Sequence, residues 1–392
     1  MVATHSESAF TATHTHGSPE GRATSSAQLA LLRDVEWDFA GRETGSDLEN
    51  LHPYPAKFIP DIPSAILDCL PPPPGTAVLD PFVGSGTTLV ECQRRGIPSI
   101  GVDLNPIACL ISRVKTSPLP QGLVSVGQQV IERKTRLVAH APQIPNVDHW
   151  FSETVKERLA KLRLAISTAP LRYRDALRLA LSSIIVKVSR QDSDTRYAAI
   201  DKNINGDDVV RLFMQSLTRI AFALQKRDYA LAHTRVIEQD ALSLTRQDVP
   251  SSVGAVITSP PYPNAYEYWL YHKYRMWWLG HDPIAVKRQE IGARAHFFKK
   301  DHHTSGHFFD QMTVLFSRLV QMIHRDGYAC FVIGRSKIHG SIIDNAEIIN
   351  DVGAAYGFRN VFEAERTIAA SRKSFNLSHA NIKSETVLVL AR

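Results

Sequence analysis

Cysteine is scarce in this sequence, and long apolar runs are absent. The four cysteines among 392 residues lie far apart, and no two of them form a C-x-x-C pair. This spacing argues against a disulfide framework and against a cysteine-rich zinc site, so we expect a protein of a reducing compartment, the cytoplasm. No apolar run approaches the roughly 18 residues that span a bilayer, which argues against a membrane partner.

The N-terminal stretch lacks the features of a targeting segment. Residues 1–27 are rich in Ser, Thr and His, and they contain no apolar core of the kind that marks a secretory signal. We therefore expect residues 1–27 to form a disordered tail.

Charge and length set only wide bounds. Basic residues exceed acidic ones by six and the pI is near 9.1, a balance that permits a polyanionic partner without requiring one. A chain of this length allows two or three domains, or one large α/β domain that carries an insertion. The positive excess lies in residues 151–236, which hold sixteen Lys or Arg and nine Asp or Glu.

The apolar pattern predicts a parallel sheet interrupted by a helical block. A buried strand at 76–81, a glycine turn, a helix over 89–95 and a strand at 99–103 form a βαβ unit. Apolar residues then recur at helical spacing between 111 and 233. The remaining predicted elements are strands at 234–240, 254–258, 328–333, 360–367 and 386–390 and helices over 62–70, 312–323 and 342–356.

A glycine-rich turn joins the first predicted strand to its helix. Glycines let the backbone approach a ligand closely and leave N–H groups that point at it. A nucleotide P-loop is excluded because Thr87, not Lys, follows Gly86. The dinucleotide fingerprint fails as well, since Leu89 stands where its third glycine belongs.

S-adenosylmethionine fits this turn better than a phosphate-bearing cofactor does. Asp80 at the strand end suits the cationic methionine moiety, and Asp103 ends the next strand where a carboxylate would accept from ribose hydroxyls. Asp240 ends a third strand and would face the adenine amino group. A tight turn without a ligand remains the alternative at this point.

A second motif, Ser259-Pro260-Pro261-Tyr262, follows the strand at 254–258. Open α/β sheets bind ligands at this edge, and two prolines fix the backbone and remove two N–H donors. Ser259 and a proline carbonyl would accept the two hydrogens of a planar amino group, while Tyr262 offers a face for stacking. A rigid turn without a chemical role is the competing interpretation.

Together, the stretches 80–88 and 258–262 resemble two signature motifs of the DNA amino-methyltransferases, which methylate N4 of cytosine or N6 of adenine. Residues 52–60, with Lys57 and Phe58, resemble a third, cofactor-side motif of that family. The resemblance implies an α/β fold with a Rossmann-like class I methyltransferase sheet, a reversed last strand and a helical insertion. It also implies S-adenosylmethionine as the methyl donor and double-stranded DNA with a flipped target base as the partner.

Carried over by position, the resemblance assigns two groups of residues. The target base would be held by Ser259, Pro260, Pro261 and Tyr262. The cofactor would be held by Lys57, Phe58, Asp80, Phe82, Gly84, Gly86, Thr87, Asp103 and Asp240. The chain then divides into a tail (1–27), a cofactor-binding half (28–110), a basic helical insertion (111–233) and a catalytic half (234–392).

The resemblance favours a site-specific cytosine-N4 enzyme, because serine in the first position of the second motif is commoner among those members. Adenine N6 is the close alternative, followed by guanine N2 in RNA and by an inactive nucleic-acid-binding platform. Methylation at cytosine C5 is excluded, since none of the four cysteines follows a proline. A restriction or other defence component is a further partner of such enzymes, and no resident metal is expected.

Several segments outside the two motifs are candidates for nucleic-acid contact. We expect the basic insertion to read the target, with 263–310 as a second contact surface. The aromatic stretch 264–279 favours packing under the second motif over wedging into DNA. The histidines between 296 and 307 favour a DNA-facing loop over a zinc site. For 190–196 and for 372–376 the sequence leaves two alternatives open, phosphate contact and a plain surface loop.

Overall fold

The computed structural model of this chain describes residues 25–42, 45–133, 139–249, 251–264, 266–298, 303–368 and 384–392. Most of the expected tail lies outside these residues. Its last part does not match the expectation, because helix α1 (Ser26–Arg33) begins there. Ser25 and Gln28 cap the start of this helix with reciprocal hydrogen bonds. The buried side chain of Leu32 packs the helix against the rest of the fold.

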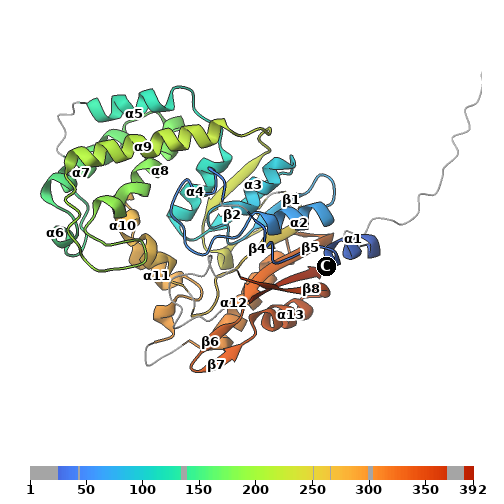
Figure 1. The fold of residues 1–392 in the computed structure, drawn as a ribbon. Coiled ribbons are helices and arrows are strands. Elements are labelled where there is room, and N and C mark those ends of the chain that lie inside the picture. The colour runs from blue at the N-terminus through green and yellow to red at the C-terminus, as the bar shows by residue number, and fades with distance from the viewer. Residues whose placement is uncertain are drawn as a thin grey trace, which may run out of the picture.

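A seven-stranded sheet in the order β3-β2-β1-β4-β5-β9-β8 forms the centre of the fold (Figure 1). Strands β1 to β5 pair in parallel, and β9 runs antiparallel to both of its neighbours. The predicted α/β class, a Rossmann-like class I methyltransferase sheet with a reversed last strand, is therefore confirmed. The strands are β1 (Ala77–Asp80), β2 (Ser99–Asp103), β3 (Thr234–Glu238), β4 (Val253–Thr258), β5 (Ile323–Gly334), β8 (Arg359–Thr367) and β9 (Ser384–Ala391).

The central strands are buried on both faces, because alternate residues enter two separate cores. Val78 of β1 lies in the cluster that includes residues of α1, α2 (Asp61–Cys69) and α3 (Thr87–Arg94). Its neighbour Leu79 lies in the opposite cluster, which is filled from α12 (Ser305–Leu319) and α13 (Asn345–Ala355). This three-layer arrangement holds the carboxyl ends of the parallel strands along one edge.

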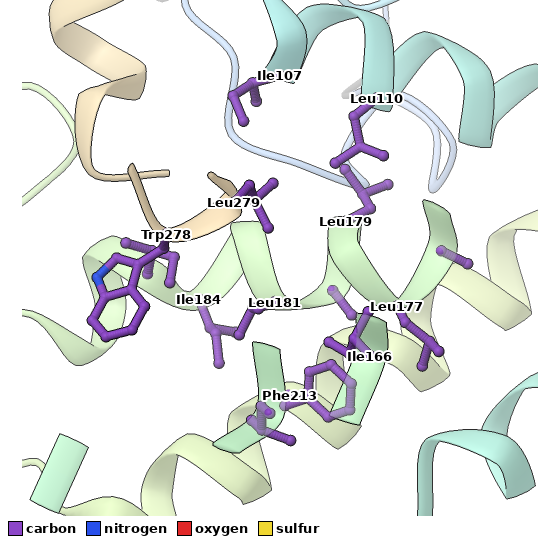
Figure 2. Close-up of a cluster of buried hydrophobic side chains, with 14 of the residues drawn as sticks. Ile107, Leu110, Ile166, Leu177, Leu179, Leu181, Ile184, Phe213, Trp278 and Leu279 are labelled. Carbon is purple, nitrogen blue, oxygen red and sulfur yellow. The ribbon is translucent and has the colours of Figure 1, made fainter. Parts of the chain in front are cut away.

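A block of helices stands to one side of the sheet, between β2 and β3 in the chain (Figure 1). Figure 2 shows its core around α8 (Leu171–Val188). Leu179 points toward Leu110 of α4 (Pro106–Thr116), and Ile184 lies near Trp278 of α10 (Tyr268–Leu279). None of the helices in the described ranges is long and apolar enough to cross a membrane. The helices are α4 (Pro106–Thr116), α5 (Leu123–Glu132), α6 (Val147–Trp150), α7 (Glu153–Ser167), α8 (Leu171–Val188) and α9 (Gly206–Gln225).

The aromatic stretch after β4 forms α10 (Tyr268–Leu279), followed by α11 (Pro283–Gln289) and a 3₁₀ turn, η2 (Arg294–His296). The prediction that its aromatics pack under the second motif is wrong for the C-terminal half of α10. Tyr274 and Trp278 contact Phe151 at ring-centroid distances of 5.8 and 5.5 Å, inside the core of the helical block. This half of α10 lies against α8 rather than against the sheet, so its rings fill the helical core.

Two boundaries in the catalytic half also differ from the prediction. The helix expected over 312–323 ends at Leu319, because Ile323 pairs with Val253 and opens β5. The helix expected from 342 begins at Asn345, since residues 336–343 form an antiparallel hairpin of β6 (Ser336–Ile338) and β7 (Ser341–Ile343).

Candidate active site

The two signature motifs meet at the carboxyl edge of the sheet. The Thr258 hydroxyl at the end of β4 donates to Asp80 Oδ1 at the end of β1 over 2.6 Å, and the Phe82 N–H donates to the same oxygen. Asp80 is 2% exposed, and its burial raises the pKa of the carboxyl from 3.8 to about 6. The glycine turn and the serine-proline turn are thus joined by one buried hydrogen bond.

The glycine turn has a backbone that only glycine adopts without strain. Gly84 and Gly86 have φ angles of 49° and 82°, and a Cβ on Gly86 would lie 2.8 Å from Ser112 Oγ and 3.0 Å from Ser112 Cα. Asp103 Oδ2 accepts from the Gly84 N–H at 2.9 Å. Thr87 begins α3 directly after the turn and is buried. A side chain on Gly86 would collide with Ser112, so the backbone of the turn packs directly against α4.

Asp103 stands at the end of β2 beside this turn. Its Oδ1 accepts from the Asn105 N–H at 2.8 Å, and burial raises its pKa to about 6. Its backbone carbonyl accepts from Gln239 N–H at 3.0 Å, which brings the end of β3 close. Asp240, the next residue, caps the 3₁₀ turn η1 (Ala241–Ser243) through the Leu242 N–H. The structure therefore groups Asp80, Asp103 and Asp240 along one edge.

Lys57 and Phe58 have other partners than the glycine turn. Lys57 Nζ donates to the Glu49 carbonyl at 2.7 Å, and Phe58 packs against the cluster around α2. Tyr54 of the same segment lies on the turn instead, since a Cβ on Gly84 would be 3.2 Å from its hydroxyl oxygen. The cofactor roles of Lys57 and Phe58 therefore rest on the resemblance alone, and Tyr54 is the residue that sequence reasoning passed over.

The serine-proline turn is fixed by the last strand of the sheet. Tyr262 Oη donates to Glu385 Oε1 at 2.7 Å, and Glu385 also pairs with the buried Arg366. Ser259 Oγ lies 3.5 Å from Tyr262 Oη. Because the single proton of Tyr262 is donated to Glu385, the Ser259 hydroxyl can only be the donor in that long contact. The lone pairs of Ser259 are then available to accept from a ligand.

Proton loss from Tyr262 is opposed by its surroundings. Burial and the neighbouring Glu385 carboxylate raise the pKa of the phenol well above 10. Tyr262 therefore keeps its proton at neutral pH and acts as a hydrogen-bond donor with an aromatic face. Among the described residues there is no group of three or more His, Cys, Asp or Glu side chains that could hold a metal ion.

A row of aromatic rings lies beside the glycine turn. Tyr54 stacks on Tyr268 with ring centroids 5.7 Å apart, and Tyr266 lies 5.6 Å from Tyr268. Glu290 fixes the start of α10, because its carboxylate accepts from the N–H groups of Tyr268 and Trp269 at 2.8 and 2.7 Å. Burial raises the pKa of Glu290 to about 8. The aromatic composition of this stretch was visible in the sequence, whereas the contact with Tyr54 was not.

The other segments considered for nucleic-acid contact have structural partners where they are described. Asp194 pairs with Arg275, and Arg190 donates to the carbonyls of Asp148 and His149. Residues 190–196 thus form a loop between α8 and α9 in which Arg190 and Asp194 have partners within the fold, and phosphate contact by this loop stays a prediction. The rings of His303 and His307 stack at 4.3 Å, while the stretch 372–376 lies outside the described residues.

Comparisons with known proteins found similarity to DNA methyltransferases over part of the chain. A family model described as DNA methylase matches residues 15–113. Type II methyltransferase M.MjaII of Methanocaldococcus jannaschii is 42% identical over 86 residues, which are 21% of this chain and 16% of that protein. Type II methyltransferase M.MvaI of Kocuria varians is 23% identical over 252 residues, which are 57% of this chain and 55% of that one. The chain thus spans about half the length of M.MvaI, and less of M.MjaII.

Among solved structures, the rRNA methyltransferase aviRa from Streptomyces viridochromogenes aligns with 89% of this chain and 93% of its own, at 13% identity and a TM-score of 0.36. The family model and the two Type II relatives confirm the resemblance of this chain to the DNA amino-methyltransferases, a family that takes its methyl group from S-adenosylmethionine.

Proposed function

We propose that this chain is a site-specific DNA methyltransferase that transfers a methyl group to the exocyclic N4 of cytosine. The observation that carries the proposal is the bond between Thr258 and Asp80, which joins the cofactor-side turn to the serine-proline turn. The substrate in this proposal is double-stranded DNA with its target base flipped out. A companion restriction or defence component belongs to the same proposal.

S-adenosylmethionine fits the residues of the cofactor-side turn. Glycine at 84 and 86 lets the turn keep its left-handed φ angles, and Asp80 offers a buried carboxylate to a cationic group. When bound, this cofactor supplies a methyl group activated by a sulfonium. Asp103 would accept from the ribose hydroxyls, and Asp240 would face the adenine.

The task of the serine-proline turn is to make an amino nitrogen nucleophilic. The lone pair of a cytosine amino group is delocalised into the ring, so the nitrogen attacks poorly. Ser259 Oγ and the Pro260 carbonyl would accept its two hydrogens, which favours a pyramidal nitrogen with a localised lone pair. The direction of the Tyr262–Glu385 hydrogen bond supports this role, since it leaves the Ser259 oxygen free to accept. After the transfer, the extra proton leaves for water.

The helical block is the part that we propose reads the target. Residues 151–236 account for the whole positive excess of the chain, and positive charge favours contact with phosphates. The aromatic and basic stretch 263–310 would add a second contact surface beside the flipped base.

The proposal is tested by product analysis. The purified protein is incubated with isotope-labelled S-adenosylmethionine and mixed-sequence duplex DNA, with tRNA in parallel, and the products are digested to nucleosides and separated by mass. We expect label in N4-methylcytosine. Label in N6-methyladenine would keep the family and refute the choice of base, and label in RNA alone would overturn the DNA assignment.

A serine variant then tests the site. Ser259→Ala should lower turnover on the order of a hundredfold, as when one polarising group is removed from an active site, while the Kd for S-adenosylmethionine stays near that of the wild type. The matched control is Ser251→Ala, an exposed serine just before the other end of β4, which should change neither value. Normal turnover of Ser259→Ala would contradict the assignment.

A further inference from the structure

His52 joins the segment that carries Tyr54 to the helical block. Its imidazole is 2% exposed, with Nδ1 2.7 Å from the Pro53 carbonyl and Nε2 2.9 Å from Ser182 Oγ on α8. A carbonyl only accepts, so Nδ1 carries the proton and the Ser182 hydroxyl donates to Nε2. Burial and the positive charges of nearby Arg275, Lys57 and Lys115 lower the pKa of His52 well below 6.5, which agrees with this neutral tautomer.

Ser182 is itself held firmly from the side of the helical block. Its carbonyl accepts from Arg275 Nε at 3.3 Å, and Arg275, on α10, is 1% exposed. The guanidinium also donates to the Tyr271 carbonyl at 3.1 Å and pairs with Asp194. The charge of Arg275 is therefore balanced, and the position of Ser182 is set by α8, by α10 and by the loop that carries Asp194.

The segment 51–58, which carries His52 and Tyr54, is not held by hydrogen bonds between backbone groups. In the described part of the chain, no backbone–backbone hydrogen bond involves residues 51–58, and prolines at 53 and 55 remove two donors. Yet Tyr54 lies against Gly84 and stacks on Tyr268. Side-chain contacts must therefore hold Tyr54 on the turn, and the His52–Ser182 bond is the one nearest to it in the chain.

We propose that His52 is a positioning residue: it anchors the segment 51–58 to Ser182 and so places Tyr54 against the turn that binds S-adenosylmethionine. The helical block then sets the affinity for the cofactor, although none of its helices carries a predicted cofactor-binding residue. This inference rests on the proposed function for the identity of the cofactor.

The test measures the Kd for S-adenosylmethionine by calorimetry on the full chain, without DNA. We expect Ser182→Ala and His52→Ala each to weaken binding about tenfold. The matched control is Ser183→Ala, because the Ser183 hydroxyl is equally buried one residue further along α8 but bonds to Ser216 inside the block at 2.6 Å. Ser183→Ala should lower the melting temperature to a similar extent and leave the Kd unchanged.

A double-mutant cycle separates positioning from general destabilisation. Tyr54→Ala should weaken binding with His52 intact, and adding Ser182→Ala to it should cause no further loss. Additive losses, or equal Kd values for the Ser182→Ala and Ser183→Ala variants, would overturn the inference. A wild-type protein that binds no S-adenosylmethionine would overturn the proposed function together with this inference. A wild-type protein that binds it with a Kd unaffected by Ser182→Ala overturns this inference alone.

Discussion

The hydroxyl of Tyr262 donates to Glu385 Oε1 at 2.7 Å, so the antiparallel last strand fixes the aromatic ring of the serine-proline turn. Glu385 is held in turn by Arg366 of β8, which is 4% exposed and donates to the Trp37 carbonyl. The reversed strand therefore has a local task at the site. It supplies the acceptor that sets the direction of the hydroxyl protons of Tyr262 and Ser259.

Tyr262→Phe should separate this orienting task from stability. The change removes the hydrogen bond to Glu385 and the long contact with Ser259 but keeps the Glu385–Arg366 pair, so it should cost about 1 kcal/mol of unfolding free energy. Turnover should fall about tenfold because the Ser259 hydroxyl loses its acceptor and can turn its proton toward the target amino group. Thermal melting and single-turnover rates check both values, and unchanged turnover would show that the ring alone suffices.

Glu385→Ala should have a larger effect on stability, in addition to freeing the Tyr262 hydroxyl. It leaves the buried Arg366 guanidinium without its carboxylate, which costs about 3–5 kcal/mol when one partner of a buried pair is removed. A drop in the melting temperature much larger than that of Tyr262→Phe is therefore expected. Equal drops for the two variants would mean that Arg366 finds another acceptor.

Much of the sheet could be predicted because its strands are short apolar runs with turn residues at their ends. The strand expected at 99–103 has the bounds of β2. The helix expected over 312–323 is longer than the observed one because Met322 and Ile323 continue its apolar pattern. In the structure, Ile323 instead pairs with Val253 and belongs to β5. That pairing joins distant parts of the chain and has no local signal.

The same reasoning explains which candidate site residues could be predicted. Asp80, Gly84, Gly86 and Ser259 stand in contiguous motifs, whose chemistry can be read locally. Glu385 and Tyr262 are 123 residues apart, and a glutamate at the start of a strand has no signature. In the sequence, Asp194 belongs to a polar segment typical of a surface loop. Only the fold brings it beside the buried Arg275.

The ion pair between Asp194 and Arg275 gives a test of that structural reading. Asp194→Ala leaves a guanidinium that is 1% exposed without its counter-charge, and we expect a loss of about 3 kcal/mol. Asp192→Ala is the matched control in the same loop, because Asp192 pairs with Arg196, whose side chain is 75% exposed, and such pairs contribute about 0–1 kcal/mol. Denaturant unfolding measures both changes, and similar losses would contradict a structural role for Asp194.

The glycine turn can be tested against a glycine of similar backbone. Gly75 has φ 76° and no atom within 4 Å of an added Cβ, whereas a Cβ on Gly86, at φ 82°, meets the Ser112 backbone at 3.0 Å. Both changes to Ala should cost about 1–2 kcal/mol for the left-handed conformation. Gly86→Ala should lower the free energy of unfolding by roughly a further 1–3 kcal/mol, because its Cβ would overpack the contact with Ser112. It should also weaken S-adenosylmethionine binding. Equal stability and affinity in the two variants would refute the close packing of Gly86 on Ser112 and its role at the cofactor site.

The raised pKa of Asp80 predicts how stability depends on pH. Because the folded protein holds this proton more tightly than the unfolded chain, the stability contributed at low pH is lost as pH rises from 3.8 through about 6. The full loss for this buried carboxyl amounts to about 3 kcal/mol. Asp80→Asn cannot ionise, and its side-chain oxygen can still accept from Thr258, so the stability of the variant relative to the wild type should increase between pH 4 and pH 7.

Denaturant unfolding of both proteins across this range measures that change, and a difference that stays constant would show that the pKa of Asp80 is not raised. Asp103, whose pKa is also raised to about 6, is present in both proteins, so its own titration largely cancels in the comparison. The affinity for S-adenosylmethionine should change with pH in the opposite direction to stability. In its proposed role, Asp80 attracts the cationic ligand only when its carboxyl group is ionised. The wild-type affinity for S-adenosylmethionine should therefore increase from pH 5 to pH 7. The affinity of Asp80→Asn should be lower at pH 7 and depend less on pH.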